Sequence, residues 1–517
     1  MKNNKKAFLQ WEIDLGKNNV LFTDEATEIY GKNTNGGEVS IAGALLPHST
    51  EEVQSLVHTA NCEKVPLYPI STGNNWGYGS SMPVTHHNVI VDLKGMDKIV
   101  DFDTDLGIVT IQPGVTQEIL HEYIEKNNLP FITPVTGAGP HCSILANILE
   151  RGYGITPIAD HFSALTSLHV VLPDGSLYRS ALEEMGGTLI DRAYKYGIGP
   201  YLNGLFTQSN FGIVVQASIV LAPKPAHSEI FYFTLKKSTN LEMIVPSVSK
   251  ILSSLGLVIG GINLMNQERV DSMSRTLSRH KESTTPSWTG IGVLYGEKCI
   301  VDSAKPFLRK NLKKHVNQLF FIRIDWFKKI YPFLAKFPLP AFLLAKLETF
   351  YRSIDLFLGI PSTVALPLAY KKSGTLPKNL SDADVARDGC GLIWFTPLVP
   401  MKPDLVEKYI AVVRRVCTKF EVEPLITLSS LNERCFDSTV PLLFDKSNGD
   451  AIEKARACYD ALWSECEKLH IFPYRLPTDE MHRITQQENP FWHLIKSIKN
   501  AIDPKGIISP GRYSRTE

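Results

Sequence analysis

The sequence predicts an α+β fold of two or three domains, on three observations. The chain has 517 residues, which is more than one compact core holds. Helical periodicity alternates with short apolar runs up to Pro225, where the pattern changes. A glycine-rich loop follows a predicted strand, as in loops that bind phosphate. We expect an N-terminal domain over residues 1–225, a second α+β domain over 226–470, and a segment over 471–517 that returns to the first.

The composition excludes several classes of function. Hydrophobic residues make up 44% and charged residues 21%, as in a soluble globular protein, and the formal net charge of +1 gives no electrostatic basis for binding nucleic acid. The eight cysteines form no CxxC pair, so we expect no metal site. Free cysteines without a signal peptide favour the cytoplasm. The sequence contains no stretch of about 20 uninterrupted apolar residues, so we expect no helix to cross a bilayer.

The N-terminal elements follow from hydrophobic spacing and turn residues. Residues 51–62 place Val53, Leu56 and Val57 on one face of a predicted helix. A second helix is expected over 116–126, beginning at a Thr cap. The expected strands lie at 65–70, 89–93, 107–111 and 213–221, and a strand, a Pro-Asp-Gly turn and another strand are expected over 168–177.

The loop from Ser71 to Ser81 is the most informative single motif. Its glycines at positions 73, 77 and 79 let the backbone approach a ligand closely, and successive backbone N–H groups bind anions such as a pyrophosphate. The spacing matches neither GxGxxG nor GxxxxGK[ST], which excludes the Rossmann and P-loop motifs. Taken alone, the loop also fits an ordinary glycine-rich turn.

Six sequence blocks, taken in order, resemble the vanillyl-alcohol oxidase / p-cresol methylhydroxylase family. The resemblance runs from about residue 50 to the C-terminus and is weakest between Pro225 and Gly389. The blocks are Pro69–Gly79, Val109–Thr116, Ser143–Pro157, Tyr196–Ile213, Pro473–Arg475 and Asp503–Gly511.

The resemblance implies a split FAD-binding domain of two α+β subdomains, covered by an α+β cap domain over the flavin. It also implies a homodimer. The glycine loop would hold the FAD pyrophosphate, and the segments 138–147 and 152–157 would run along the flavin. The implied cofactor residues are Ser71, Thr72, Gly73, Asn74, Asn75, Gly139, His141, Cys142, Ser143, Asn147, Gly152, Gly154, Ile155, Ile213 and Arg512.

The resemblance further implies a site that binds a para-substituted phenol as its phenolate and passes a hydride from the benzylic carbon to flavin N5. The phenolate ligands match Tyr78, Tyr474 and Arg475. An always-charged arginine and two phenolic donors are suited to holding an oxyanion. Without the family match, Tyr474 and Arg475 also fit an amphipathic surface pair.

Several positions depart from the family pattern. Ala138 stands where an aspartate is expected near flavin N5, and Ile155 replaces a tyrosine. Leu392 occupies the position of a His or Tyr that often tethers FAD covalently, so we predict noncovalent FAD. These changes point to an altered substrate.

The sequence leaves two interpretations open for the pair His141 and Cys142, and two for Glu433. His141 and Cys142 lie on the loop expected beside the flavin, where they would form a covalent bond to it or simply pack. Glu433 matches a glutamate of the cap domain, with Cys435 in place of a neighbouring histidine. It fits a supporting acid or base, or a salt-bridge partner.

The segment 326–360 is rich in apolar residues and punctuated by lysines. It fits an amphipathic helix on a membrane or partner, or a core or dimer-interface helix pair broken at Pro338 and Pro340. For the whole chain we expect an FAD-dependent oxidase or dehydrogenase acting on a phenolic or aryl-alcohol substrate. The alternatives are an FAD enzyme for a non-phenolic alcohol or natural-product intermediate, and a flavin-binding module without catalysis.

Overall fold

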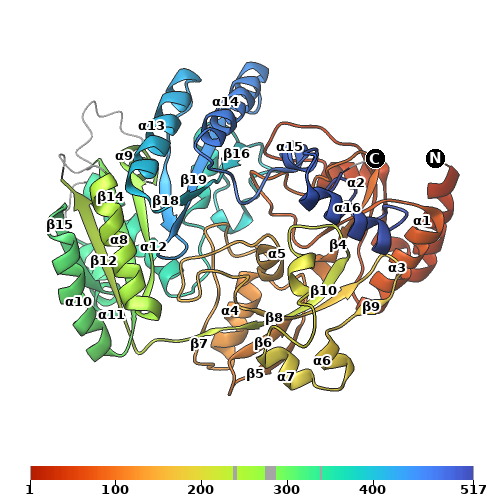
Figure 1. Cartoon of the computed structure of the whole chain (residues 1–517), viewed down its shortest axis with the longest axis horizontal. Helices are drawn as coiled ribbons and strands as arrows, with labels where there is room; N and C mark the ends of the chain where they lie inside the picture. The colour runs from red at the N-terminus through yellow and green to blue at the C-terminus, as the bar shows by residue number, and fades with distance from the viewer. Residues whose placement is uncertain (1, 237–240, 274–286, 338–340, 516–517) are drawn as a thin grey trace.

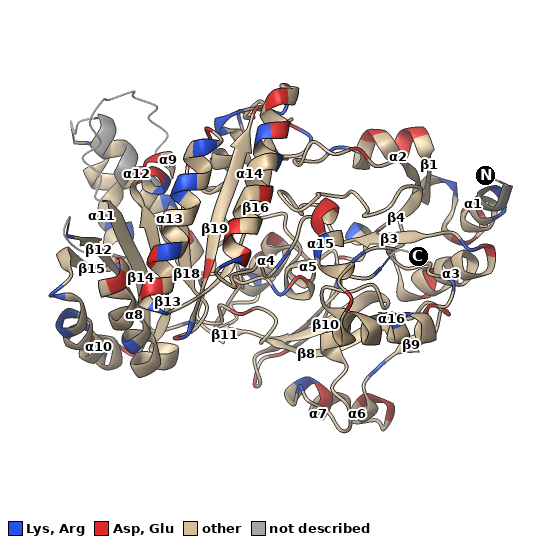
Figure 2. Ribbon diagram, turned by 45° about the horizontal axis from the view of Figure 1, so that its top comes forward, with Lys and Arg blue, Asp and Glu red and all other residues tan. Residues whose placement is uncertain are grey.

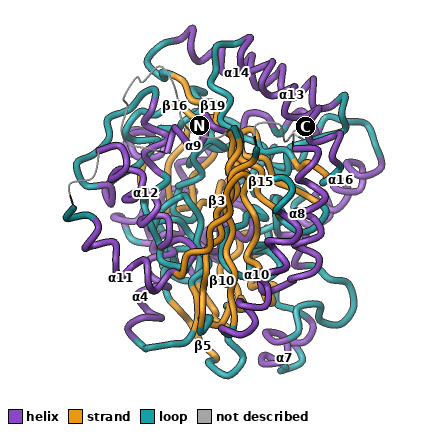
Figure 3. Tube along the Cα trace, turned by 90° about the vertical axis from the view of Figure 1, so that its left-hand side faces the viewer, coloured by secondary structure: helices purple, strands orange, loops and turns teal. Residues whose placement is uncertain are grey.

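The computed structural model describes residues 2–236, 241–273, 287–337 and 341–515. In this part of the chain the strands form three larger sheets and one pair, β7 (Phe131–Ile132) with β11 (Ala222–Pro223). Figure 3 shows strands running through the middle of the molecule with helices around them. The predicted α+β class is confirmed.

The first sheet lies in the N-terminal part and carries the glycine-rich loop. Its core strands are parallel, and the loop leaves the end of β3. Helix α3 (Thr50–Glu63), which matches the predicted helix, packs on this sheet together with α1 (Lys2–Leu15). The strand order is β1 (Val20–Phe22), β2 (Ile41–Leu45), β4 (Asn88–Asp92) and β3 (Leu67–Ile70), with α2 (Thr23–Tyr30) beside β2.

The second sheet is antiparallel and has its own apolar core. Helix α4 (Gln117–Lys126) begins where the sequence predicts, because the Thr116 side chain accepts a hydrogen bond from the Ile119 amide. The strand order is β5 (Ile99–Asp103), β6 (Ile108–Ile111), β10 (Ile213–Val220), β8 (Leu165–Val171) and β9 (Leu177–Tyr178), with the helices α5 (Ile144–Leu149), α6 (Ala181–Glu184) and α7 (Thr188–Ala193).

The third sheet is antiparallel and lies in the predicted cap range, although the domain boundaries themselves stay predictions. It occupies the left half of Figure 1. Its order is β15 (Val316–Arg323), β12 (His227–Leu235), β14 (Trp288–Gly296), β13 (Ile259–Asn266), β18 (Thr427–Ser430), β19 (Cys435–Phe444) and β16 (Gly391–Phe395), with β17 (Leu398–Pro400) also on β19.

Strand alternation gives this cap sheet two different faces. One face, with Phe231 and Leu264, packs against helices in the largest core of the protein. These helices are α8 (Leu241–Leu255), α10 (Lys298–Leu312), α13 (Pro403–Lys419) and α14 (Gly449–Glu467); α9 (Gln267–Met273) follows β13. Figure 2 shows charges of both signs on α13 and α14, as expected for solvated helix faces.

One helical segment, Leu241–Val258, is apolar and long enough to cross a membrane by length and composition alone. Core helices pass the same test. The α8 side chains Ile244, Val248 and Ile251 belong to the core under the cap sheet, and 28% of the segment is buried.

The apolar segment around 326–360 forms the helices α11 (Ile324–Leu334) and α12 (Ala341–Phe357). Their inner side chains Phe327, Ile354 and Phe357 pack on the second face of the cap sheet, which supports the helix-pair interpretation. Trp326 and Phe333 stay 55% and 67% exposed. A membrane contact or a dimer interface on this side stays a prediction, and the expected break at Pro338 and Pro340 lies outside the described residues.

The C-terminal segment returns to the first sheet, where Ile508 bridges Leu67 of β3 in parallel. It includes the helices α15 (His482–Thr485) and α16 (Pro490–Ile502). The buried ammonium of Lys499 anchors it: the Nζ atom lies 2.6 Å from the Asp503 carboxylate, and it donates to the carbonyls of Asn210 and Ile508. A buried charge is stable only when it is paired in this way.

We expect Lys499→Met to lower the free energy of unfolding by about 3–5 kcal/mol, because it leaves the buried Asp503 carboxylate without its partner. Lys496→Met, an exposed lysine on the same helix, is the matched control. Urea unfolding monitored by circular dichroism measures both. Equal stability of the two variants would contradict the anchoring role of Lys499.

Candidate active site

A cleft of about 260 Å³ lies where the first two sheets meet the C-terminal segment, with Trp394 of the cap sheet as one wall. We call it the main cleft. The glycine loop contributes residues 71–76, and the region of α5 contributes residues 142–143, 145–147 and 149–150. Segments far apart in sequence therefore build one elongated site.

The main cleft contains most of the residues that the sequence assigned to the cofactor. It is lined by both ends of the predicted pyrophosphate loop and by the start of β10. The predicted residues that line it are Ser71, Thr72, Gly73, Asn74, Asn75, Cys142, Ser143, Asn147, Ile213 and Arg512.

Two observations describe how the glycine loop borders the main cleft and where a polar ligand such as FAD would find a contact. At Gly77, where φ is +76°, an added Cβ would lie 2.2 Å from the Trp394 ring, so only glycine allows the loop to lie this close to the cap wall. The buried Ser80 hydroxyl lines the cleft and has no hydrogen-bond partner among the described residues. A buried hydroxyl without a partner is a contact for a polar ligand.

The other predicted cofactor residues lie outside this lining. The His141 ring is half exposed, 3.3 Å from Glu118, with its Nε2 atom 3.0 Å from the Ser381 carbonyl. Gly139 lies against Leu366, and Gly152 packs on the Asn147 side chain. Gly154 and Ile155 line a separate, smaller cavity.

Three segments bring the predicted phenolate ligands together. The Tyr78 hydroxyl lies 3.1 Å from the Thr396 hydroxyl, and the Tyr474 amide donates to the Thr396 carbonyl. The Arg475 guanidinium lies over the Tyr78 ring, 4.3 Å from its centroid. The Tyr474 hydroxyl in turn interacts with the Tyr78 hydroxyl. Tyr78, Tyr474 and Arg475 therefore form one cluster, in which Tyr78 is buried and the other two residues are partly buried.

Arg475 is held in place by residues of the main cleft. Its Nε atom lies 3.0 Å from the Glu150 carboxylate, and its Nη2 atom donates to the Asn75 side chain. Glu150 also pairs with Arg512, which donates to the Tyr68 hydroxyl. One carboxylate thus lies between two arginines, so these three side chains together carry a net positive charge.

Burial controls the protonation of the tyrosines. It raises the pKa of Tyr78 well above the ordinary value, although the Arg475 charge and the hydrogen bond to Thr396 act in the opposite direction. The pKa of Tyr474 is raised mainly by burial as well. Both hydroxyls therefore stay protonated near neutral pH and are available to donate to an oxyanion.

Two residues of the cluster were missed from the sequence. The Tyr153 ring lies 5.3 Å from the Tyr474 ring, and burial raises its pKa. Asp437 on β19 is fully buried, which raises the pKa of its carboxyl to about 7. Tyr153 stands two positions before Ile155, and Asp437 is an isolated carboxyl in an apolar strand; each was a signal that the sequence offered.

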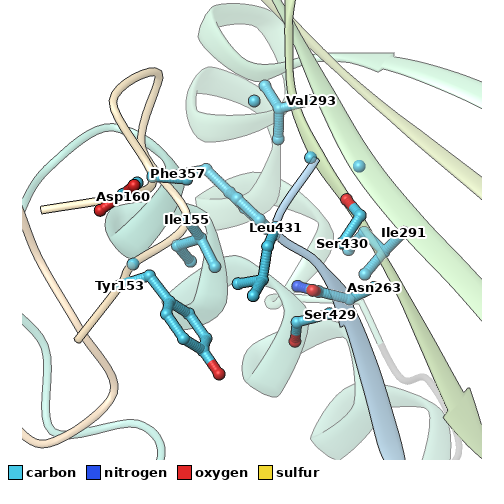
Figure 4. Close-up of a pocket in the computed structure, with 15 residues that line it drawn as sticks. Tyr153, Ile155, Asp160, Asn263, Ile291, Val293, Phe357, Ser429, Ser430 and Leu431 are labelled. Carbon is cyan, nitrogen blue, oxygen red and sulfur yellow. The ribbon is translucent and has the colours of Figure 1, made fainter. Parts of the chain in front are cut away.

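A smaller cavity of about 20 Å³ lies between Tyr153 and the cap sheet. In Figure 4, Tyr153 and Ile155 lie on one side, Asn263 and Ser429 project from strands on the other, and Leu431 lies between them. This cavity mixes apolar walls with a few polar side chains, and its volume is close to that of one water molecule. It extends the tyrosine cluster towards the cap.

The remaining predicted residues are placed as follows. Glu433 lies in the turn between β18 and β19 and pairs with Arg434, which favours the salt-bridge interpretation over a role in the site. Leu392 is buried in an apolar cluster on β16. Cys142 lines the main cleft, and burial raises the pKa of its thiol to about 12.

Comparisons with known proteins identify the fold of the cleft. Residues 41–181 match the family model described as FAD binding domain. The structure resembles that of p-cresol methylhydroxylase with substrate bound, with a TM-score of 0.86 and 25% identity over 100% of this chain and 98% of that chain. It also resembles 4-ethylphenol oxidase from Gulosibacter chungangensis in fold, with a TM-score of 0.87, 20% identity, and coverage of 100% and 98%.

Two relatives match along almost the whole sequence. The 4-cresol dehydrogenase [hydroxylating] flavoprotein subunit of Pseudomonas putida is 28% identical, covering 98% of this chain and 95% of the relative. The 1'-carboxy-chondrochloren decarboxylase of Chondromyces crocatus is 31% identical, covering 92% of this chain and 90% of the relative. The chain therefore belongs to the vanillyl-alcohol oxidase / p-cresol methylhydroxylase family of FAD-dependent oxidoreductases.

Proposed function

We propose that this enzyme oxidises a para-substituted phenol, which it binds as the phenolate. The observation that carries the proposal is the cluster in which Arg475 lies over Tyr78 and beside Tyr474. A permanent cation with two protonated hydroxyls is complementary to an oxyanion. The names of the Pseudomonas putida relative and of the two solved structures, which refer to cresol or ethylphenol, support a substrate of this class.

The cluster contributes charge stabilisation and orientation. Arg475 is kept from rotating by Glu150 and Asn75, so its guanidinium is organised before the substrate arrives. Holding the phenol as its anion raises electron density at the para position, which favours departure of a hydride from the carbon attached there. FAD, when bound in the main cleft, supplies the acceptor for that hydride.

Ala138 offers no carboxylate at its position on the cleft wall, and Ile155 offers no hydroxyl in the smaller cavity. An apolar para substituent needs neither of these polar groups. We therefore propose a para-alkylphenol rather than a non-phenolic alcohol as the substrate class.

We expect Arg475→Ala to lower kcat/KM for a para-alkylphenol by about 100- to 1000-fold, as removal of one oxyanion donor does elsewhere. Tyr78→Phe should lower it roughly ten- to a hundredfold, because a hydrogen bond to a charged group is lost. Arg415→Ala, an exposed arginine on α13, is the control. Steady-state rates are compared at matched FAD content.

The phenolate proposal would be contradicted if the enzyme oxidised a non-phenolic alcohol at a rate that neither Arg475→Ala nor Tyr78→Phe changed. Because the Chondromyces crocatus relative is named a decarboxylase, the substrate panel includes a para-substituted phenol that carries a carboxylate. Release of carbon dioxide from that compound would identify decarboxylation as the reaction.

We further propose that FAD is bound noncovalently. Leu392 has no nucleophilic atom and is 4% exposed within an apolar cluster. The Cys142 thiol is held in its protonated form by burial, and the thiolate is the form that attacks. The His141 ring makes its polar contacts with Ser381 and Glu118 rather than with the main cleft.

Acid precipitation of the purified protein should therefore release the flavin into the supernatant, where its absorbance is measured. Cys142→Ser should give the same result as the unmodified protein. Flavin that stays in the wild-type pellet but is released from Cys142→Ser would overturn the proposal and identify Cys142 as the tether.

A further inference from the structure

Asp437 carries a buried carboxyl that lies beside the Tyr153 hydroxyl. Neither of its carboxylate oxygens has a hydrogen-bond partner among the described residues, and the side chain is fully buried. Buried carboxyls are normally hydrogen-bonded or paired, and the exceptions gather at functional sites. The position of Asp437 relative to the tyrosine cluster therefore needs an explanation.

The register of the cap sheet places Asp437 on the face that lines the smaller cavity. Ile291 of β14 lies opposite Asn263 of β13, Asn263 lies opposite Ser429 of β18, and Ser429 lies opposite Asp437. Directly opposed residues share a face of a sheet. Ile291, Asn263 and Ser429 line the cavity of Figure 4, and Asp437 is the next residue in this row.

Tyrosine hydroxyls connect Asp437 to the phenolate ligands. The Tyr153 hydroxyl lies beside the Asp437 carboxyl, and like that carboxyl it makes no hydrogen bond of full geometry among the described residues. The Tyr474 hydroxyl interacts with the hydroxyls of both Tyr153 and Tyr78. A continuous set of polar groups thus runs from the Arg475 side of the cluster to Asp437.

The other titratable groups that face Asp437 do not accept a proton near neutral pH. They come from five segments of the chain. Tyr153, Tyr474, Tyr78 and Tyr409 have a pKa raised by burial, and burial also raises the pKa of the Cys435 thiol, so all of these are already protonated. Arg475, which lies beside Tyr78 and Tyr474, is a permanent cation.

We propose that the Asp437 carboxylate accepts the proton that a phenolic substrate loses when it binds as the phenolate. This inference rests on the proposed function. The substrate O–H bond breaks, each intervening tyrosine hydroxyl gains one proton and passes on another, and an O–H bond forms on Asp437. The net change is phenol plus carboxylate to phenolate plus carboxylic acid, and no electrons are transferred. When the product leaves, Asp437 returns the proton.

The first test counts protons during binding of 4-hydroxyacetophenone, which has no benzylic hydrogen to lose and whose anion absorbs at longer wavelength than the neutral phenol. Binding to the FAD-loaded enzyme is measured slightly above neutral pH. A difference spectrum shows the anion, and calorimetry in two buffers with different ionisation enthalpies gives the proton release. We expect Asp437→Asn to release more protons than wild type, by up to one per site.

The outcomes separate the two proposals. If the wild type binds the ligand without anion absorbance, the phenolate proposal itself is wrong. If the anion forms with equal proton release in wild type and Asp437→Asn, the role of Asp437 is overturned. Asp445→Asn, a partly exposed carboxyl beyond the end of β19, should match wild type. If Asp437→Asn does not retain FAD, the same measurement is made on Tyr153→Phe. This variant removes the hydroxyl between Tyr474 and Asp437 but keeps the Asp437 carboxyl.

The pH dependence of kcat/KM provides a second readout. Asp437 accepts a proton only when ionised, and its pKa is raised to about 7 by burial, so the wild-type value should fall as the pH drops through about 7. Asp437→Asn should lack this acid limb and show a lower plateau. A variant that keeps the same limb would contradict the proposal, since a purely structural role does not move a titration.

Discussion

The active site depends on the placement of one buried cation, Arg475. A guanidinium removed from water is stable only with partners, and Glu150 and Asn75 provide them. Because these partners lie on the wall of the main cleft, the charge is fixed between the cofactor site and the tyrosine cluster. Asn75, Glu150 and Arg475 come from the glycine loop, the end of α5 and the C-terminal segment, so these three segments must meet for the contacts to form.

The fold achieves this meeting by closing the chain on itself. Lys499 and Asp503 hold the C-terminal segment against the first sheet, and Ile508 pairs beside β3, from which the glycine loop leaves. The cap sheet contributes Thr396 and Trp394 at one edge. The charge, the hydroxyl donors and the cleft wall therefore come from different sheets and segments, so a defect in the closing contacts should affect cofactor binding as well as stability.

Local signals predicted much of this structure. The Thr116 cap, the helix at 51–62 and the glycine loop follow from short-range spacing and turn chemistry, and the family resemblance identified Tyr78, Tyr474 and Arg475. Contacts set by tertiary structure were not predictable in the same way. Nothing local indicates that Glu150 pairs with Arg475 from the far end of the chain.

Tyr153 and Asp437 show the same limit more sharply. Each was visible as an unusual residue, but only the register of the cap sheet and the packing of its second face bring them together. Glu433 matched a family position and kept two interpretations, and its ion pair with Arg434 favours the salt-bridge partner. Sequence spacing predicts faces and loops, whereas the pairing of distant polar groups depends on the completed fold.

Binding of the substrate as a phenolate is tested most directly by anaerobic absorbance spectroscopy of the FAD-loaded enzyme. A para-alkylphenol and its methyl ether have the same carbon skeleton, but only the phenol can ionise. Electrostatic stabilisation by Arg475 predicts that the phenol bleaches the flavin absorbance and that the methyl ether leaves it unchanged. Equal bleaching by both compounds would contradict a site built for an oxyanion.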